Sequence, residues 1–217
     1  YQDDFPVGLL YIAKALQEIE ISVSIHDARK TELEKINLDS VLLVGFTVLT
    51  GDMIAVALKS AQRIRNERPD IPIVFGGIHP STMPEQTAQH PLVDIVVVGE
   101  GERTTQDLAQ CLAVNGDISE VKGIVFQNSD GEIVKTGSRE YIDLDTLDYK
   151  LPYELLDYDP AKMRLIPVHT SRGCPWRCSF CYNVAVHNRS YRVKSPDRVL
   201  EEIEYVVKRF NVHHIDF

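Results

Sequence analysis

The sequence has no apolar stretch long enough to cross a membrane as a helix. The longest apolar run, Val41 to Leu49, contains Gly45 and Thr47 and falls short of the roughly 18 residues that such a helix needs. The chain begins with polar and acidic residues, whereas a secretory signal peptide is basic and then apolar. These absences predict a cytoplasmic protein with no membrane partner.

Cysteine is scarce, and basic residues are outnumbered by acidic ones. Four cysteines in 217 residues are too few for a disulfide scaffold. The net charge of −9 disfavours general binding to nucleic acid, because a polyanion binds basic surfaces. Hydrophobic residues make up 44% of the chain, which is ordinary for a globular protein with a buried core and excludes a disordered or collagen-like chain.

The charge is distributed unevenly along the chain. Residues 161–198 carry eight basic side chains and one acidic side chain, a net charge of +7 within an acidic protein. Three of the four cysteines lie in this basic segment. The charge alone fits either a solvated surface or a local anionic ligand. Clustered thiols in a reducing compartment, however, indicate metal ligands or redox groups.

Helical and strand-like patterns alternate through the first half of the chain. The predicted helices cover residues 7–19, 52–67, 83–89 and 103–114. The predicted strands cover residues 21–25, 41–46, 71–75 and 94–98. This alternation is typical of a Rossmann-like α/β fold, a doubly wound parallel sheet with helices on both faces. Such domains usually open with a strand, so we expect a first strand upstream of Tyr1.

Residues 117–160 depart from the alternating pattern. Asn128–Gly131 lies between two short apolar runs and predicts the turn of a β-hairpin. Residues 139–160 are acidic, aromatic and contain proline, which is typical of an ordered linker.

The β/α pattern then restarts. A strand is predicted at 164–168, a long loop from Thr170 to Ser195, a helix near 197–210 and a strand at 213–217. We therefore divide the chain into domains at 1–116, 117–160 and 161–217. The last domain ends inside a β/α unit, so we expect it to be truncated.

Cys174, Cys178 and Cys181 form a CxxxCxxC motif directly after a predicted strand. Thiolates are soft ligands that select iron–sulfur clusters or zinc. With three nearby ligands, a [4Fe–4S] cluster keeps one iron open for a substrate. Zinc needs a fourth ligand, which His187 could supply as a Cys3His set. The spacing favours the cluster, whereas Cys111 lies on the apolar face of a predicted helix and is interpreted as core packing.

Residues 171–182, Ser-Arg-Gly-Cys-Pro-Trp-Arg-Cys-Ser-Phe-Cys-Tyr, resemble the cluster loop of radical S-adenosylmethionine (SAM) enzymes. The run from Asn188 to Pro196 is similar to the segment after that loop in the family. The resemblance implies that the three cysteines ligate a [4Fe–4S] cluster whose fourth iron binds SAM. One electron, from an external flavodoxin- or ferredoxin-like reductant, would then cleave SAM to methionine and a 5′-deoxyadenosyl radical. The basic segment would offset the negative charge of the cluster and tune its potential.

Three loops that follow predicted strands of the first domain are rich in glycine and small polar residues. The carboxyl ends of parallel strands meet at one sheet edge, where ligands of such folds bind, so we expect a cofactor site there. No GxGxxG motif or phosphate-loop lysine is present, which disfavours a nucleotide. The candidate residues are Thr47, Leu49, Thr50 and Gly51 in the first loop, Gly76, Gly77 and His79 in the second, and Gly99, Glu100 and Gly101 in the third.

This set of loops resembles the cobalamin-binding domain that precedes the cluster domain in a large radical SAM class. Thr47-Val48-Leu49 matches its Ser/Thr-x-Leu element, Gly76-Gly77 matches its double glycine, and Phe5 to Tyr11 is similar to the start of its first helix. In that fold the loops surround the dimethylbenzimidazole tail of the cofactor. The family's lower axial histidine precedes the first helix. The chain has no histidine there, so we expect cobalamin without a histidine on cobalt.

The resemblance implies a cobalamin-dependent radical SAM enzyme, here its cobalamin domain and the start of a partial (β/α) barrel. The expected reaction is methyl transfer to an unactivated carbon of a small-molecule or natural-product substrate. Ring formation, as in the anaerobic magnesium-porphyrin cyclases, is the enzymatic alternative. The other alternative is a corrinoid- or nucleotide-binding module with a structural zinc site. No catalytic residue is assigned, and we expect residues 1–217 alone to be inactive.

Overall fold

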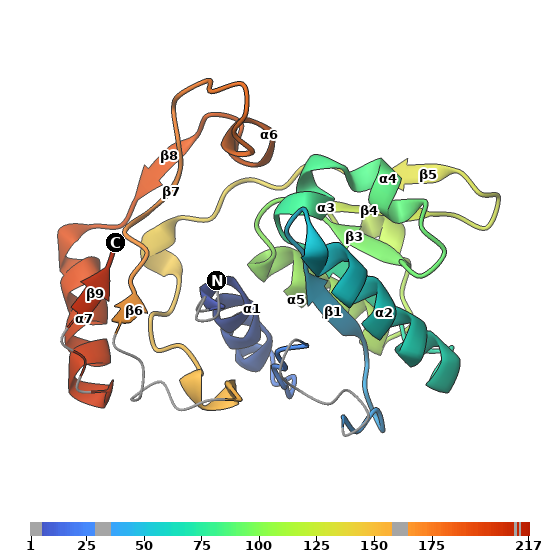
Figure 1. The fold of residues 1–217 in the computed structure, drawn as a ribbon, viewed down its shortest axis with the longest axis horizontal. Helices are drawn as coiled ribbons and strands as arrows, with labels where there is room; N and C mark the ends of the chain where they lie inside the picture. The colour runs from blue at the N-terminus through green and yellow to red at the C-terminus, as the bar shows by residue number, and fades with distance from the viewer. Residues whose placement is uncertain (1–5, 29–35, 158–164, 211, 213) are drawn as a thin grey trace. The chain divides into compact units, whose positions relative to one another are not determined.

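The structure is a computed structural model that describes residues 6–28, 36–157, 165–210, 212 and 214–217. The chain forms two compact units (Figure 1). One unit comprises residues 27–140, and the other joins residues 1–26 to residues 141–217. The second unit is therefore assembled from both ends of the chain. None of the described helices is long and apolar enough to span a membrane.

A mixed five-stranded sheet forms the centre of the unit of residues 27–140. Its strands lie side by side in chain order: β1 (Val44–Thr47), β2 (Ile73–Gly76), β3 (Ile95–Val97), β4 (Ile124–Gln127) and β5 (Ile133–Lys135). The first three strands pair in parallel, whereas β3, β4 and β5 pair antiparallel. The predicted hairpin therefore exists. It extends the sheet, however, where the sequence placed it in a separate segment of residues 117–160.

Helices cover both faces of this sheet. Side chains of α2 (Asp52–Glu67) and α4 (Pro84–Ala88) pack on one face, in a core that includes Phe75 of β2. Side chains of α5 (Glu102–Ala113) pack on the other face, together with the 3-10 turn η2 (Ile118–Glu120). The doubly wound α/β prediction is confirmed. Cys111 packs against the second core, as its position on an apolar helix face predicted.

The predicted strand over residues 21–25 is wrong. Ile21, Val23 and Ile25 do alternate in exposure with their neighbours, but residues 21–27 have no regular structure. A strand is held by hydrogen bonds to a neighbouring strand. No described strand pairs with this segment, so it forms no inter-strand hydrogen bonds with the described strands despite its alternating pattern.

The described strands of the second unit form two pairs, one in a β/α repeat and one in a hairpin. β6 (Leu165–Pro167) pairs in parallel with β9 (His214–Asp216), and α7 (Pro196–Phe210) lies between them in the chain, as predicted. β7 (Ser171–Gly173) and β8 (Tyr191–Val193) pair antiparallel inside the segment predicted as one long loop. Figure 1 shows this hairpin extending beyond α7 to a tip that carries α6 (Asn183–His187).

Helix α1 (Val7–Glu18) packs into the second unit. Leu10 and Tyr11 are buried in a core shared with Val206 of α7. The described part of the predicted linker also enters this core through Leu151 and Tyr153. The linker is ordered there, with two 3-10 turns, η3 (Leu144–Thr146) and η4 (Tyr153–Leu155).

The compact units therefore divide the chain differently from the predicted domains at 1–116, 117–160 and 161–217. The physical reason is the apolar stripe of α1, which is buried against residues 141–217. The apolar pattern of α1 in the sequence does not show whether the helix packs on the sheet or on residues 141–217.

Candidate functional site: two groups of loops

The loops after β1 and β2 are joined at the carboxyl edge of the sheet. The Val48 N–H donates to the Gly76 carbonyl at 2.9 Å, and the His79 N–H donates to the Val48 carbonyl at 3.0 Å. The Thr50 hydroxyl lies 3.1 Å from His79 Nδ1. These contacts hold the first two candidate loops as one surface, as the sheet-edge argument predicted.

Gly77 is required where the two loops cross. Its φ of +92° lies in the left-handed region, which other residues rarely adopt. A Cβ added here would lie 2.8 Å from Thr47 Oγ1 and 3.0 Å from the Val48 nitrogen. The second residue of the double glycine therefore has a geometric cause, because the first loop lies directly against the backbone at Gly77.

The third loop is tied to the second by Ser81. The Gly99 N–H donates to Ser81 Oγ at 2.9 Å, and the Ser81 hydroxyl donates to the Gly77 carbonyl at 2.7 Å. Ser81 is buried in the short helix α3 (Ile78–Thr82) and was not among the predicted site residues. A small polar residue one helical turn after Gly77 was the available signal for this role.

The edge that these loops form exposes apolar as well as small side chains. Leu49 is 44% exposed and Met53 is 36% exposed, although both are large and hydrophobic. Thr50 and Gly51 beside them are also exposed. This edge combines exposed apolar surface with backbone that carries no bulky side chains. Such a surface suits a ligand with a flat apolar group.

The three clustered cysteines lie on the loop that joins β7 to β8. Cys174 directly follows β7 and is half-buried, as is Cys181, whereas Cys178 is exposed. The Cys181 N–H donates to the Cys178 carbonyl at 3.1 Å, which turns the chain between these two thiols. The Asn183 amide donates to Cys181 Sγ at 3.6 Å. Both strands that flank this loop were missed by the sequence analysis.

Gly173 brings the two ends of this cysteine loop together. Its φ is +85°, and a Cβ added to it would lie 1.9 Å from the Ser190 carbonyl oxygen. On the returning side, Asn188 and Arg189 also have positive φ values, of 42° and 63°. The loop is therefore closed at its base by backbone contact, in a way that only glycine permits at position 173.

The three cysteines form no ready-made metal site in this structure. Among the described residues, no three His, Cys, Asp or Glu side chains gather closely enough to hold a metal ion. His187, the alternative fourth zinc ligand, lies in α6 with its ring 6.4 Å from that of Tyr141. The donor set still fits an iron–sulfur cluster, because three soft thiols share one short exposed loop and can close around it.

The basic residues around the loop are held by aromatic rings. Arg172 and Arg192 face each other across the β7–β8 ladder. The Arg172 guanidinium lies 5.2 Å from the centre of the Tyr11 ring, and that of Arg192 lies 4.6 Å from the centre of the Tyr141 ring. Cation–π contacts of this kind fix positive charge in place. The basic segment is thus more than a solvated surface.

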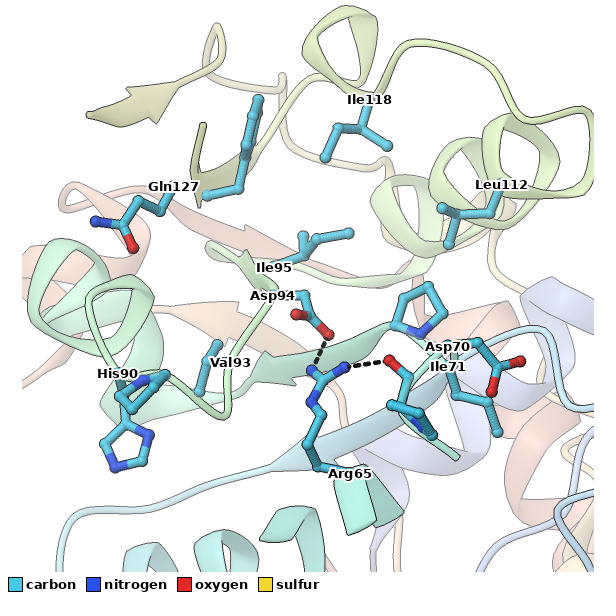
Figure 2. Close-up of a pocket in the computed structure, with 14 residues that line it drawn as sticks. Arg65, Asp70, Ile71, His90, Val93, Asp94, Ile95, Leu112, Ile118 and Gln127 are labelled. Atoms are coloured by element: carbon cyan, nitrogen blue, oxygen red, sulfur yellow. Dashed lines mark hydrogen bonds and ion pairs between the residues drawn. The ribbon is translucent and has the colours of Figure 1, made fainter. Parts of the chain in front are cut away.

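A separate cavity of about 500 Å³ lies at the amino ends of β2 and β3, at the edge opposite to the candidate loops. Figure 2 shows Arg65 reaching into it toward Asp94. Arg65 donates to Asp94 Oδ2 at 2.5 Å and to the Pro69 carbonyl at 2.9 Å. The same Asp94 oxygen accepts from the Ile73 N–H at 2.7 Å. These charged groups bind one another and connect α2 to two strands, so we assign no ligand here.

The joined loops at the sheet edge are typical of the class of α/β proteins that bind a cofactor there. The family model described as the B12 binding domain matches residues 1–109, half of the chain. The chain therefore belongs to the B12-binding domain family.

Two curated relatives illustrate this family. An uncharacterised methyltransferase of Pyrococcus horikoshii is 30% identical over 98% of this chain and 48% of its own length. The anaerobic magnesium-protoporphyrin IX monomethyl ester cyclase of Rubrivivax gelatinosus is 35% identical over 82% of this chain and 33% of its own length. The chain thus spans half or less of the relatives it matches.

The fold is also that of a solved radical SAM methyltransferase. TsrM from Kitasatospora setae, with cobalamin and a [4Fe–4S] cluster bound, superposes with a TM-score of 0.75 at 20% identity. The match covers 96% of this chain and 44% of that one. The likeness extends over both compact units and agrees with the predicted α/β fold.

Proposed function

We propose that the chain is part of an enzyme that uses cobalamin and a [4Fe–4S] cluster to transfer a methyl group from SAM to an unactivated carbon. The observation that carries this proposal is the presence of both groups of loops in one chain: joined small-residue loops at a sheet edge, and three thiols on one hairpin. The methyltransferase relative that matches almost the whole chain supports the choice of reaction. The substrate would be a small molecule or natural product.

Cys174, Cys178 and Cys181 would hold three irons, and the cluster, reduced by a flavodoxin- or ferredoxin-like protein, would supply the electron that cleaves SAM. The chain's own groups would prepare this site. Arg172 and Arg192 place positive charge at the base of the loop and offset the charge of the thiolates. The Asn183 amide donates to the sulfur of Cys181 and would help to orient this ligand.

Cobalamin would bind at the carboxyl edge of the sheet. Gly99 leaves room for close approach of the nucleotide tail, because a Cβ there would meet nothing within 4 Å. Gly76 and Gly77 would line the same surface, and the exposed Leu49 would contact the apolar ring of the tail. Thr47, Thr50, Gly51, Glu100 and Gly101 complete the proposed surface. His79 is held by Thr50 within the second loop, which agrees with a corrinoid that takes no histidine from this loop.

The cobalamin proposal is tested by incubating the whole chain with hydroxocobalamin, desalting it and recording the visible spectrum. We expect a retained corrinoid. The EPR spectrum of its reduced cobalt form should lack histidine-nitrogen hyperfine splitting. A chain that retains no corrinoid would contradict the binding site, and a histidine splitting would contradict the axial prediction alone.

Ring formation is the second candidate, because the magnesium-protoporphyrin cyclase relative is 35% identical to this chain. The protein that carries this chain should be supplied with SAM bearing a deuterated methyl group, a reductant and a small-molecule extract of its source cells. Methyl transfer predicts a product that gains the deuterated methyl group. A cyclase predicts an oxidised ring product without the label, and that result would overturn the methyltransferase proposal.

A further inference from the structure

A lysine and a glutamate are paired inside the unit that carries the cysteine loop. The side chains of Lys194 and Glu202 are 3% and 1% exposed, and the Lys194 ammonium donates to Glu202 Oε2. Burying two charges is costly unless each remaining polar group also finds a partner. The partner here comes from helix α1.

Tyr11 of helix α1 completes this ion pair. Its hydroxyl, on a side chain buried in the same core, accepts a hydrogen bond from Lys194 Nζ at 3.0 Å and donates to Glu202 Oε1 at 3.4 Å. The three groups form a closed ring of donors and acceptors drawn from α1, α7 and the residue after β8. The tyrosine hydroxyl thus bridges both charges of the pair.

The same tyrosine also contacts both strands of the cysteine hairpin. Arg172 of β7, two residues before Cys174, lies over the Tyr11 ring at 5.2 Å. Lys194, bonded to the Tyr11 hydroxyl, directly follows β8, and its N–H donates to the Thr170 carbonyl at 2.9 Å. Tyr11 is therefore fixed to the entry and to the exit of the loop that carries all three clustered thiols.

We propose that Tyr11 is a positioning residue for the cysteine loop: its ring and hydroxyl fix the two strands of the β7–β8 hairpin and so set the arrangement of the three thiols. The inference rests on the proposed function in one respect, namely that the three thiols bind an iron–sulfur cluster. It assigns to α1, a helix that precedes the cobalamin-type sheet in the chain, a role at the cluster loop. No contact of Tyr11 with the cluster or with SAM is needed.

Hydrogen exchange of the cluster-free chain tests the contact itself. Tyr11→Phe removes only the hydroxyl, and we expect exchange of the amides of residues 171–173 and 191–194 to speed up on the order of tenfold, the effect of losing one hydrogen bond to a charged group. Tyr205→Phe is the matched control, because this tyrosine of α7 bonds Arg209 on the surface instead. Exchange of β2 in the other unit should not change. Unaltered hairpin exchange in Tyr11→Phe would overturn the inference.

The spectrum of the cluster separates positioning from simple structural support. After anaerobic reconstitution, the reduced cluster of Tyr11→Phe should show altered g-values or a broadened EPR signal, whereas Tyr205→Phe should give the wild-type signal. A loosened hairpin with an unchanged EPR signal would reduce Tyr11 to a structural role and overturn the proposal. If the wild-type chain takes up no cluster, the proposed function fails, while the exchange data still decide whether Tyr11 holds the hairpin.

Discussion

Gly173 precedes the first cysteine of the loop, and its backbone faces the carbonyl of Ser190 across the hairpin. Gly77 occupies a similar crossing between two loops of the sheet edge. Both residues have a positive φ, which residues with a side chain rarely adopt. At both sites a neighbouring backbone or hydroxyl atom also lies closer than a Cβ allows, so each position requires glycine for two reasons.

Gly173→Ala should destabilise the cysteine hairpin. The left-handed conformation alone costs about 1–2 kcal/mol for alanine, and the contact with Ser190 forces the strands apart. We expect loss of most bound iron after reconstitution, with the sheet unit still folded by circular dichroism. Gly137→Ala is the control, because its Cβ would meet no atom within 4 Å. Wild-type iron content in Gly173→Ala would refute the geometric argument.

Gly77→Ala should weaken corrinoid binding. An added Cβ pushes the Thr47–Val48 backbone away from the second loop, so the joined surface opens. We expect at least a tenfold increase in the dissociation constant for hydroxocobalamin, measured by absorbance titration, a change of about 1.4 kcal/mol. Gly45→Ala, in the same unit with open space around its Cβ, should bind like the wild type. Equal affinities for all three proteins would argue against the proposed site.

At the scale of elements, α1 is held to the rest of its unit by buried groups of two kinds. Leu10 and other apolar residues enter a shared core, and Tyr11 joins the pair of Lys194 and Glu202. At its surface, Lys14 forms an ion pair with Asp148 of the predicted linker at 2.8 Å. The helix is thereby fixed to α7, to the cysteine hairpin and to the segment after η3.

Lys194→Met should lower the free energy of unfolding by about 3–5 kcal/mol, because it leaves the Glu202 carboxylate buried without its cation. The double variant Lys194→Met/Glu202→Leu removes both charges and should recover most of this loss. Denaturant unfolding measures both. Lys208→Met, which removes one member of an exposed pair with Glu204, should change stability by less than about 1 kcal/mol. Full stability of Lys194→Met would contradict the buried pair.

Acid should weaken the ion pair between α1 and the linker. Partial burial works to raise the pKa of Asp148, but hydrogen bonds from Lys14 and from the Lys150 N–H, with the nearby positive charges, outweigh it and lower that pKa below its ordinary value of 3.8. A carboxylate whose pKa is lowered by folding adds stability above its unfolded pKa and loses it as the pH falls through the folded value.

We therefore expect Asp148→Asn to be less stable than the wild type at pH 6, and the difference to shrink as the pH falls below the ordinary pKa of 3.8 and through the lowered folded value. Chemical denaturation at both pH values measures it. Asp130→Asn, on the exposed β4–β5 turn, is the matched control and should show no such convergence. A difference that persists at low pH would exclude the ion pair as its source.

The sequence predicted the strands that lie in continuous apolar runs and missed the strands whose pairing depends on distant residues. The apolar runs of β1, β2 and β3 needed no partner to be recognised. The strand at 21–25 was wrong, because alternation cannot show whether a neighbouring strand is present. β7 was missed because Ser-Arg-Gly has no strand pattern; Gly173 and the Arg172–Arg192 pairing become meaningful only when the returning strand is known.

The candidate site shows a similar division. The CxxxCxxC spacing and the glycine-rich loop ends are local signals, so they could be predicted residue by residue. Ser81, which joins two loops, and Tyr11, which lies more than 150 residues from the cysteines in the chain, could not. Their roles arise from contacts that the fold creates between residues far apart in sequence.

At the scale of the whole molecule, the chain combines two proposed cofactor sites that depend on different physical interactions. The sheet unit offers backbone and apolar surface at the ends of parallel strands. The second unit offers soft thiols on a hairpin whose two strands carry arginines held over aromatic rings. The methyl transfer that we propose would need both sites, and it would depend above all on an iron–sulfur cluster held by the three clustered thiols.

Anaerobic reconstitution of the whole chain with iron and sulfide, followed by analysis of iron, zinc and acid-labile sulfide, detects this cluster without relying on activity. We predict about four iron and four sulfide per chain, bleached by air. This content should be lost in the Cys174→Ala/Cys178→Ala/Cys181→Ala variant and kept in Cys111→Ala, whose cysteine packs against the core. Iron and sulfide retained by the triple variant, or stoichiometric zinc in place of iron in the wild type, would contradict the assignment.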